Sequence, residues 1–299
     1  MKFSAFLCSY SGLYARGAST EEVIRAAAEA GFGAVEPFPA EDLNTVDAAR
    51  AAGECARALG LEVCCFSDNF ELLRDPDAMQ RARGHIDLAA AMGSPYYHHT
   101  IYPPLSLRRA RECSRREALD AAVPRLRELC AYAADRGVTC LYENQGLYFN
   151  GVEGMRMLVD RMDGAPYGLV ADVGNIFFVD ERPEDFIGAF ADRIVHVHLK
   201  DYLWKPGSEL CPGRGWYLTR GGNYLRDTIP GHGAVRFPAV LRVLDAMGYQ
   251  GWHSLEYAAM EDAGFGIGMA LDYLRACGRA VAEHRPQEPR FEGVSPVFE

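Results

Sequence analysis

Four ionisable side chains stand at or near the ends of four apolar runs in this sequence. The runs are "VTCLYEN" (138–144), "YGLVADV" (167–173), "IVHVHLK" (194–200) and "GWHSLEY" (251–257), and the side chains are Glu143, Asp172, His198 and Glu256. Three carboxylates and one imidazole suit Mn²⁺, Mg²⁺, Co²⁺ or Zn²⁺, and are too anionic for a typical structural zinc site. If the runs are successive strands of one barrel, the pattern predicts a single divalent-cation site.

Two histidines stand two residues apart within one of these runs, at His196 and His198. Side chains alternate along a strand, so both imidazoles point to the same face. His198 lies nearer the end of the run and is the expected ligand. We expect His196, one layer deeper, to pack or to support the ligands.

The elements that must position these residues follow one rhythm, a short apolar run and then an Ala-rich helical segment. Explicit caps mark the helices, since Ser19 and Glu22 open the first and glycines such as Gly31 and Gly93 end several. The other four strand candidates are "KFSAFLCS" (2–9), "AVEPF" (34–38), "EVCCFS" (62–67) and "PYYHHT" (95–100).

Eight alternating units of this kind predict an α/β fold with a parallel sheet closed into a single (β/α)₈ TIM barrel. A doubly wound open sheet is the alternative. It usually carries a Gly-rich phosphate-binding turn after the first strand, and the stretch at 9–12, "SYSG", is not one. In a barrel, chemistry belongs at the carboxyl ends of the strands.

Composition indicates one globular domain over residues 1–299, with a long excursion at 202–231 after the seventh strand and a C-terminal tail from about 285. Apolar residues make up 49% of the chain and charged residues 24%. The net charge of −10 argues against a nucleic-acid partner, because phosphate neutralisation needs a basic face. A small polar ligand such as a sugar or cyclitol fits this composition better.

The nine cysteines include no C-x-x-C pair, which indicates reduced, buried thiols and a reducing compartment. We find no run of about 18 apolar residues, and the apolar stretch after the first methionine is too short for a signal peptide. The expected location is therefore the cytoplasm, with no membrane partner.

Four stretches carry a resemblance to a known family: "YEN" (142–144), "VADVGN" (170–175), "HVHLKD" (196–201) and "PGHGAVRFPAVLRVLDAMGYQGWHSLE" (230–256). The chain resembles the xylose isomerase-like sugar isomerase/epimerase superfamily, which includes ketose 3-epimerases, inosose dehydratases and, more distantly, apurinic endonucleases. The resemblance runs from the first strand to about Tyr273. It implies a TIM barrel and a metal-dependent enzyme of carbohydrate metabolism.

The matching motifs place Glu143, Asp172, His198 and Glu256 at the positions of the family's metal ligands, the same residues that the strand ends indicate. A divalent cation there would polarise a ketose carbonyl. The resemblance further implies that Glu143 and Glu256 act as catalytic acid and base, removing and returning a proton through an enediolate.

Two features depart from the family pattern. Where family epimerases often have a histidine three residues after the sixth-strand aspartate, this chain has Asn175, an amide that cannot shuttle protons near pH 7. The connection at 202–231 is about twice as long as a strand-to-helix loop requires. Its aromatic and cationic residues suit a lid over a substrate, and an ordered surface excursion or a contact within a homo-oligomer is the alternative.

Other polar residues near the predicted strand ends are candidate substrate contacts. Lys200 and Asp201 end the seventh strand as an electrostatic clamp or as a rim salt bridge, and Asn144 follows Glu143 directly. His232 lies in the "PGHG" turn. In "PYYHHT" the two histidines point to opposite faces, so at most one faces the interior; we expect His99 to contact the substrate.

The resulting interpretation is a divalent-metal-dependent sugar isomerase or epimerase acting on a keto-sugar. A lyase of the same superfamily stays open, either an inosose dehydratase or an enzyme that cleaves 3-keto-glycosides, because the metal site does not say which bond breaks. A sugar-binding barrel without catalysis is the alternative outside enzymes. It gives no reason to retain three converging carboxylates, whose repulsion raises their pKa values.

Overall fold

The computed structural model describes residues 1–102 and 104–283. The expected tail from about 285 lies outside these residues. A nine-stranded parallel sheet forms the centre, in the order β3-β2-β1-β12-β8-β7-β6-β5-β4. Its strands are β1 (Lys2–Phe6), β2 (Ala34–Glu36), β3 (Glu62–Val63), β4 (Phe66–Asp68), β5 (Tyr96–His99), β6 (Thr139–Glu143), β7 (Tyr167–Asp172), β8 (Ile194–Leu199) and β12 (Trp252–Leu255).

The sheet closes into a barrel because its two end strands, β3 and β4, belong to one segment. Cys64 and Cys65 separate them, and Cys64 N donates to Val35 O at 3.0 Å, which continues the pairing with β2. On the other side, β4 pairs in parallel with β5. Eight strand positions therefore form the ring, and the predicted (β/α)₈ TIM barrel is confirmed.

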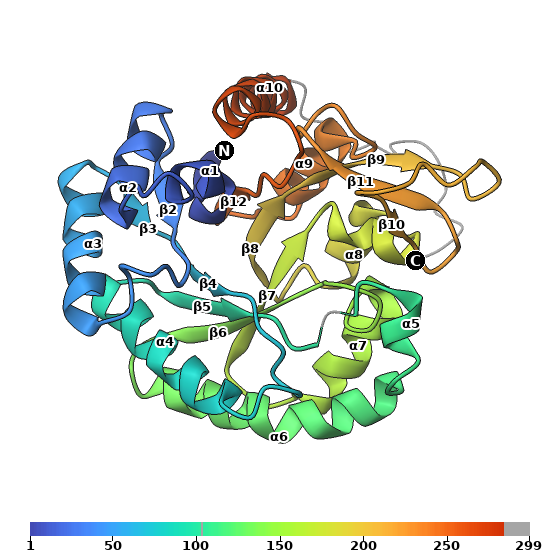
Figure 1. Cartoon of the computed structure of the whole chain (residues 1–299), viewed down its shortest axis with the longest axis horizontal. Coiled ribbons are helices and arrows are strands. Elements are labelled where there is room, and N and C mark those ends of the chain that lie inside the picture. The colour runs from blue at the N-terminus through green and yellow to red at the C-terminus, as the bar shows by residue number, and fades with distance from the viewer. Residues whose placement is uncertain (103, 284–299) are drawn as a thin grey trace, which may run out of the picture.

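Helices surround the ring (Figure 1). They are α1 (Ser11–Tyr14), α2 (Thr20–Glu29), α3 (Val46–Ala58), α4 (Ala78–Met92), α5 (Leu107–Ala110), α6 (Arg115–Ala134), α7 (Gly151–Arg161), α8 (Pro183–Ala189), α9 (Phe237–Ala246) and α10 (Ala263–Glu283), with 3₁₀ helices η1 (Leu7–Tyr10) and η2 (Asn175–Val179). The predicted capping box of α2 is present: Glu22 N donates to Ser19 Oγ, and Ser19 N donates to the Glu22 carboxylate.

Several predicted strands extend beyond the observed ones; the second, for example, ends at Glu36 and not at Phe38. The difference is largest for the first strand. The first strand ends at Phe6, not at Ser9, and the chain then turns into η1. Ser9 holds this turn against the last strand of the barrel, because its hydroxyl donates to Leu255 O at 3.2 Å and accepts from Tyr257 N at 2.8 Å. The apolar run continues past the strand because these residues are buried in the turn as well.

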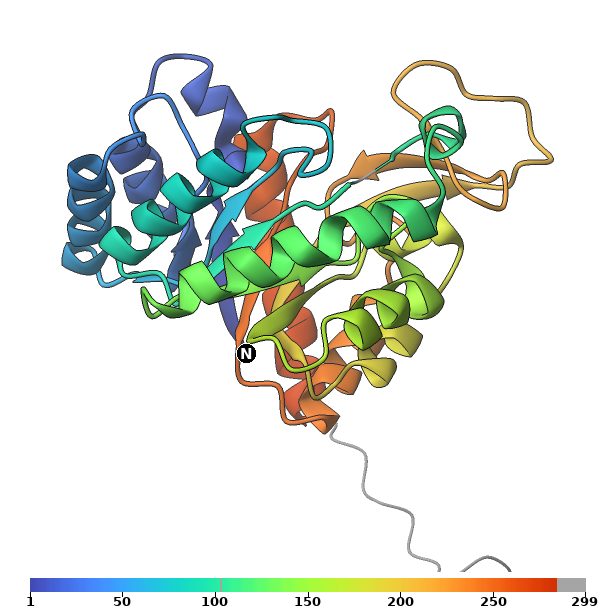
Figure 2. The same cartoon turned by 90° about the horizontal axis from the view of Figure 1, so that it is seen from below.

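The excursion after the seventh strand forms a second, antiparallel sheet in the order β10-β11-β9. We call β9 (Asp201–Lys205), β10 (Tyr217–Leu218) and β11 (Tyr224–Thr228) the ribbon sheet. It stands out from the barrel together with its connecting loop (Figure 2). The apolar periodicity of the barrel strands gave no sign of this sheet, which pairs with itself and not with the barrel.

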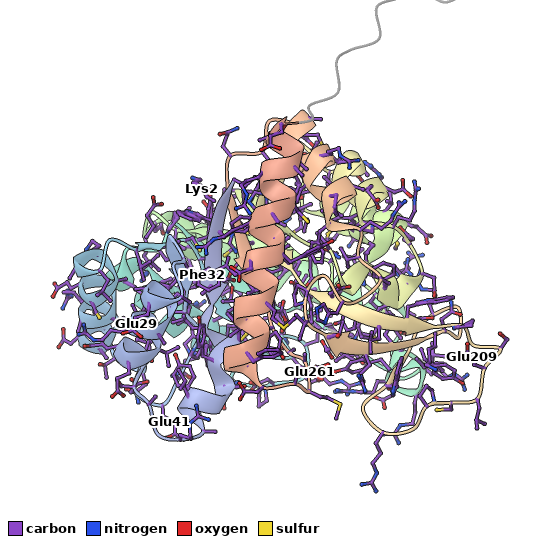
Figure 3. The ribbon with its side chains drawn as sticks, turned by 90° about the horizontal axis from the view of Figure 1, so that it is seen from above. Lys2, Glu29, Phe32, Glu41, Glu209 and Glu261 are labelled. Carbon is purple, nitrogen blue, oxygen red and sulfur yellow. The ribbon has the colours of Figure 1, made fainter. Side chains whose placement is uncertain are left out.

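The two ends of the barrel differ in what they carry. Lys2 lies at the end reached by the last turn of α10, whereas Glu41, Glu209 and Glu261 lie toward the other end, where the strands finish (Figure 3). The catalytic end of a TIM barrel is the one where the strands finish. Among the described residues, no helix combines the length and the apolar character needed to cross a bilayer.

Close helix packing generates the first prediction. A Cβ atom on Gly53 of α3 would overlap the main-chain oxygen of Met92, because α3 and α4 approach each other there. We expect Gly53→Ala to destabilise the protein by about 1–3 kcal/mol through overpacking. Gly84→Ala on α4 is the matched control, because open space surrounds that position.

Helix propensity alone predicts that Gly84→Ala is neutral or stabilises by about 0.5–1 kcal/mol. Urea unfolding of both variants measures the difference. Equal effects of the two substitutions would contradict the close approach of α3 and α4.

Candidate metal centre inside the barrel

The structure brings the four predicted ligands together. Glu143 ends β6, Asp172 ends β7, His198 lies in β8 and Glu256 follows β12, and these four strands are neighbours in the sheet. Each residue offers one ligand atom, and these atoms all lie within 4.8 Å of one another. Parallel register explains the convergence, because Asp172 pairs with His198 in adjacent strands. We call these four residues the metal cluster.

His198 is the centre of the cluster. Its Nδ1 lies 2.7 Å from Glu143 Oε1 and 3.4 Å from Glu256 Oε2, and its Nε2 lies 2.9 Å from Glu36 Oε1. Burial alone would lower the pKa of His198, but the Glu36 and Glu143 carboxylates outweigh it and raise that pKa well above its usual value. A divalent cation would take the place of the proton at Nδ1.

Asp172 provides the clearest sign that a cation belongs here. Its Oδ1 accepts from Gly174 N and Asn175 N, both at 2.7 Å, whereas its buried Oδ2 has no hydrogen-bond partner in the part of the chain that is described. Burial, then the charges of Glu256 and Glu143, raise the pKa of Asp172 well above its ordinary value. A bound divalent ion would satisfy the orphan oxygen and relieve the repulsion. The donor set therefore fits a divalent ion.

Glu256 is paired with a partly buried cation, Lys200. Lys200 Nζ lies 2.6 Å from Glu256 Oε1, while Glu256 Oε2 faces His198. Burial would raise the pKa of Glu256, but Lys200 and then His198 outweigh it and lower that pKa. Glu256 thus has one oxygen at the cluster and another that is held by Lys200.

Two of the predicted substrate contacts lie against the cluster besides Lys200. Asn144 connects two strand ends, because its Oδ1 accepts from Asp172 N and its Nδ2 donates to Asp172 O, both at 2.8 Å. Asn175 follows the aspartate, and its Oδ1 accepts from the Tyr202 hydroxyl at 3.1 Å. The buried Nδ2 of Asn175 has no partner among the described residues, so it is a free donor beside the cluster.

The other three lie elsewhere. Asp201 anchors the loop after the ribbon sheet, since its two oxygens accept from the main-chain nitrogens of residues 202, 231, 233 and 235. His99 points out of the barrel interior, where its ring stacks on Phe70 and its Nδ1 lies 2.9 Å from Thr100 O. His232 is exposed in the "PGHG" turn.

The residues missed from the sequence come from the first half of the barrel. Glu36 ends β2 and is fully buried, with Oε1 near His198 and Oε2 2.8 Å from His196 Nε2. His98, the neighbour of His99, is the inward histidine of β5, and its ring lies edge-on to His198 with centroids 5.6 Å apart. Glu36 was missed because the second strand was predicted to run to residue 38, which places Glu36 inside it, whereas the observed β2 ends at Glu36. No sequence signal distinguished His98 from His99.

His196 lies one layer deeper than His198, as strand alternation predicts, and is buried against Glu36. Glu36, His196 and His198 also offer atoms within 4.8 Å of one another. Their nitrogens and oxygens are already paired as donors and acceptors, at 2.8 and 2.9 Å. The metal cluster, with its orphan oxygen, is therefore the better cation site.

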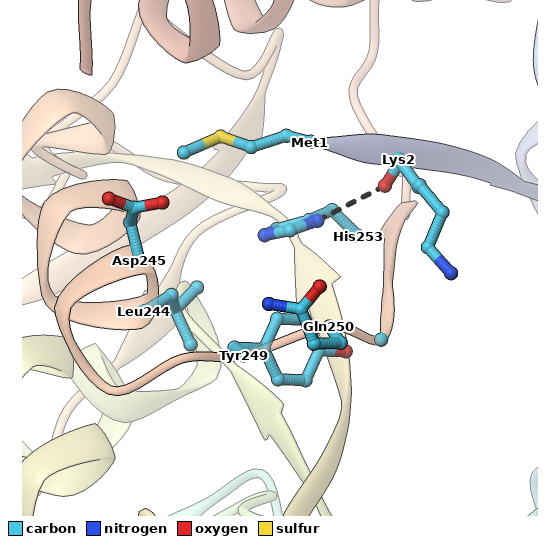
Figure 4. A pocket seen from close by; sticks show the side chains of 8 residues that line it. Met1, Lys2, Leu244, Asp245, Tyr249, Gln250 and His253 are labelled. Carbon is cyan, nitrogen blue, oxygen red and sulfur yellow. Dashed lines mark hydrogen bonds between the residues drawn. The ribbon is translucent and has the colours of Figure 1, made fainter. Parts of the chain in front are cut away.

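A pocket of about 220 Å³ lies at the other end of the barrel, where β1 and β12 begin. Figure 4 shows its side chains, among them Tyr249, Gln250 and His253, with His253 Nδ1 3.1 Å from Lys2 O. No member of the metal cluster lines this pocket. The metal cluster is therefore the candidate site, because the predicted ligands and the strand ends coincide there.

The family described as xylose isomerase-like TIM barrel matches residues 24–277, and the chain belongs to it. An inosose dehydratase from Geobacillus thermodenitrificans (strain NG80-2) is 29% identical over 143 residues, 47% of this chain and 47% of that protein. The chain spans about half the length of the curated relatives it matches.

Solved structures extend the likeness over most of the chain. An L-ribulose 3-epimerase gives a TM-score of 0.71 at 16% identity, covering 95% of this chain and 96% of that one. A xylose isomerase-like TIM barrel protein from Mycobacterium smegmatis, in complex with magnesium, gives 0.66 at 18% identity, covering 88% and 90%. At these identities the likeness concerns the fold. The sequence relative named here is thus a dehydratase and one of the structural neighbours is an epimerase, and both are enzymes.

The cluster geometry generates the second prediction. We expect Mn²⁺ to raise the melting temperature of the protein, as any ligand of the native state does. His198→Ala removes the only nitrogen ligand and should weaken Mn²⁺ binding by roughly 100-fold or more, whereas His196→Ala should mainly lower the melting temperature. Calorimetric titration and thermal melting, each with and without Mn²⁺, measure the two effects. If both variants lose the same Mn²⁺ affinity, the assignment of His198 and not His196 as the ligand is wrong.

Proposed function

We propose that this protein is a divalent-metal-dependent isomerase or epimerase that acts on a keto-sugar or cyclitol ketone by proton abstraction next to the carbonyl. The observation that carries the proposal is the placement of Glu143 and Glu256. They come from β6 and β12, the outer two of the four strands that supply ligands, with β7 and β8 between them. The two carboxylates therefore flank the cluster from opposite sides.

Each of these glutamates has one oxygen at the cluster and one that faces away. Glu143 Oε1 is near His198, and its Oε2 lies 3.8 Å from His98 Nε2. Glu256 divides its oxygens between His198 and Lys200 in the same way. Two carboxylates on opposite sides of one reacting carbon can remove a proton from one face and return a proton to the other. This arrangement supports inversion at a carbon next to a carbonyl.

The metal site supplies the electrophile in this scheme. A divalent cation held by Glu143, Asp172, His198 and Glu256 would act as a Lewis acid toward a carbonyl oxygen. Lys200 holds Glu256 in place through the 2.6 Å ion pair. The free Nδ2 donor of Asn175 is suited to orient a substrate hydroxyl or carbonyl oxygen.

A dehydration is the second candidate, favoured by the sequence match to inosose dehydratase. It begins with the same proton abstraction and differs in the loss of a β-hydroxyl. A panel of ketoses, inososes and 3-keto-glycosides, incubated with Mn²⁺, separates the outcomes. An isomer or epimer keeps the mass of its substrate, whereas dehydration removes one water and glycoside cleavage releases the aglycone.

The third prediction concerns Glu256. Glu256→Gln keeps the shape and one oxygen donor but removes the basic carboxylate, so turnover should fall roughly 10²- to 10⁴-fold while Mn²⁺ binding weakens modestly. In D₂O the wild-type protein should place deuterium on the carbon next to the substrate carbonyl, as mass spectrometry or NMR would detect. Glu261→Gln, on the same side of the barrel but exposed, is the matched control and should leave turnover unchanged.

A deuterated substrate tests the case in which the proton is transferred without exchange with the solvent. If the proton passes between shielded groups, a substrate deuterated at the reacting carbon keeps its label in the product. Absence of both solvent exchange and label transfer, with Mn²⁺ and a bound sugar present, would rule out proton abstraction and the proposed function with it.

A further inference from the structure

His98 is a buried imidazole beside the metal cluster that none of the proposed steps uses. It lies on β5 and is only 3% exposed. Its Nδ1 lies 3.2 Å from Ser67 Oγ, whereas its buried Nε2 has no hydrogen-bond partner within residues 1–102 and 104–283. An unpaired polar atom in a protein interior is costly, so it calls for an explanation.

The direction of the hydrogen bonds around Ser67 determines which nitrogen of His98 carries the proton. The Ser67 hydroxyl donates to Glu36 Oε1, a carboxylate that can only accept while ionised. Because the Ser67 hydroxyl donates its only hydrogen to Glu36, Ser67 Oγ accepts a hydrogen bond from Nδ1–H of His98. Nε2 of His98 therefore carries a lone pair and is a hydrogen-bond acceptor.

A neutral imidazole carries one proton, and the hydrogen bond from Nδ1–H to Ser67 Oγ holds that proton on Nδ1, so Nε2 is the acceptor nitrogen of His98. The lone pair of Nε2 lies 3.8 Å from Glu143 Oε2. An ionised carboxylate oxygen and an imidazole lone pair are both acceptors, so they do not bond each other. A substrate hydroxyl that comes within hydrogen-bond distance of Nε2 would donate to it and give this buried nitrogen a partner.

We propose that Nε2 of His98 accepts a hydrogen bond from a substrate hydroxyl beside the reacting carbon, which makes His98 a residue that determines specificity for polyhydroxylated ketones over their deoxy analogues. The inference rests on the proposed function, because Nε2 lies 3.8 Å from an oxygen of Glu143, one of the two carboxylates proposed to exchange the substrate proton. Glu36 orients both imidazoles, His198 directly and His98 through Ser67, so that Nδ1 of His198 and Nε2 of His98 both face the side of Glu143.

The test compares the best substrate of the ketose and inosose panel with its analogues that lack one hydroxyl next to the reacting carbon. The readouts are kcat/KM, or the rate of deuterium uptake in D₂O, and the affinity for Mn²⁺ alone. We expect the wild-type protein to prefer the hydroxylated compound over one analogue by about 10- to 100-fold, because the deoxy compound leaves Nε2 unpaired.

His98→Leu should abolish this preference and leave the Mn²⁺ affinity within about 2-fold. His98→Gln should keep part of the preference, since its carbonyl oxygen also accepts a hydrogen bond. The matched control is His253→Gln. It replaces another buried imidazole with an unpartnered Nε2, at the opposite end of the barrel, and should not change the preference.

Ser67→Ala provides a second route if thermal melting shows that His98→Leu does not fold. Without the Ser67 hydroxyl the tautomer of His98 is no longer fixed, so the preference should weaken several-fold at unchanged Mn²⁺ affinity. A purely structural role of His98 would lower the melting temperature and leave the preference intact.

Three results would overturn the inference. If His98→Leu retains the wild-type preference, His98 does not contact the hydroxyl. If His98→Leu loses Mn²⁺ affinity while the preference stays, His98 is a metal ligand. If the wild-type protein with Mn²⁺ neither binds nor exchanges any member of the panel, the proposed function fails first and the inference fails with it.

Discussion

Mutual repulsion among three closely spaced carboxylates, two of them buried and one partly buried, is the constraint around which this barrel is organised. Glu143, Asp172 and Glu256 are brought together by the register of parallel strands, and in the protein interior like charges raise the free energy of the folded state unless a cation balances them. His198 and Lys200 supply part of the balance as direct ion-pair partners. The orphan oxygen of Asp172 marks where the balance is incomplete and where a divalent ion fits.

A second buried carboxylate site, formed by Glu36 and its hydrogen-bond donors, lies deeper in the barrel. Glu36 is fully buried and accepts from His196, His198 and Ser67, which come from two other strand positions. A fixed carboxylate of this kind sets the direction of each hydrogen bond that it accepts, and so the face on which each imidazole keeps its lone pair. The chemistry proposed at the mouth thus depends on a residue that would never touch the substrate.

The ribbon sheet shows how an addition is attached without disturbing this arrangement. Asp201 follows Lys200 directly and closes the loop after β11 through main-chain donors, so the ribbon sheet begins and ends at one anchored point. The ribbon sheet also sends Asp227 to within 4.0 Å of Lys200 Nζ. The hydroxyl of Tyr202, also in the ribbon sheet, donates to Asn175 Oδ1. The ribbon sheet therefore contacts Lys200 and Asn175, two residues beside the metal cluster.

Local patterns of the sequence were sufficient to predict the barrel and the four residues that converge in the metal cluster. Strand alternation, helix caps and the chemistry of strand ends depend on neighbouring residues only, and these locate Glu143, Asp172, His198 and Glu256, with His196 one layer below. The resemblance to the family led to the same residues. The same patterns could not choose between two arrangements of the side chains that fit the local sequence equally well.

His98 and His99 are the example, because alternation says that one imidazole faces the interior but not which one. That choice depends on the register of β5 against its neighbours, in which His98 pairs with Ser67. Glu36 and Asp227 join the site from segments far away in the chain, the second through an antiparallel sheet with no barrel periodicity. Long-range pairing of this kind has no local signature, so only the tertiary structure decided which polar groups meet around the cluster.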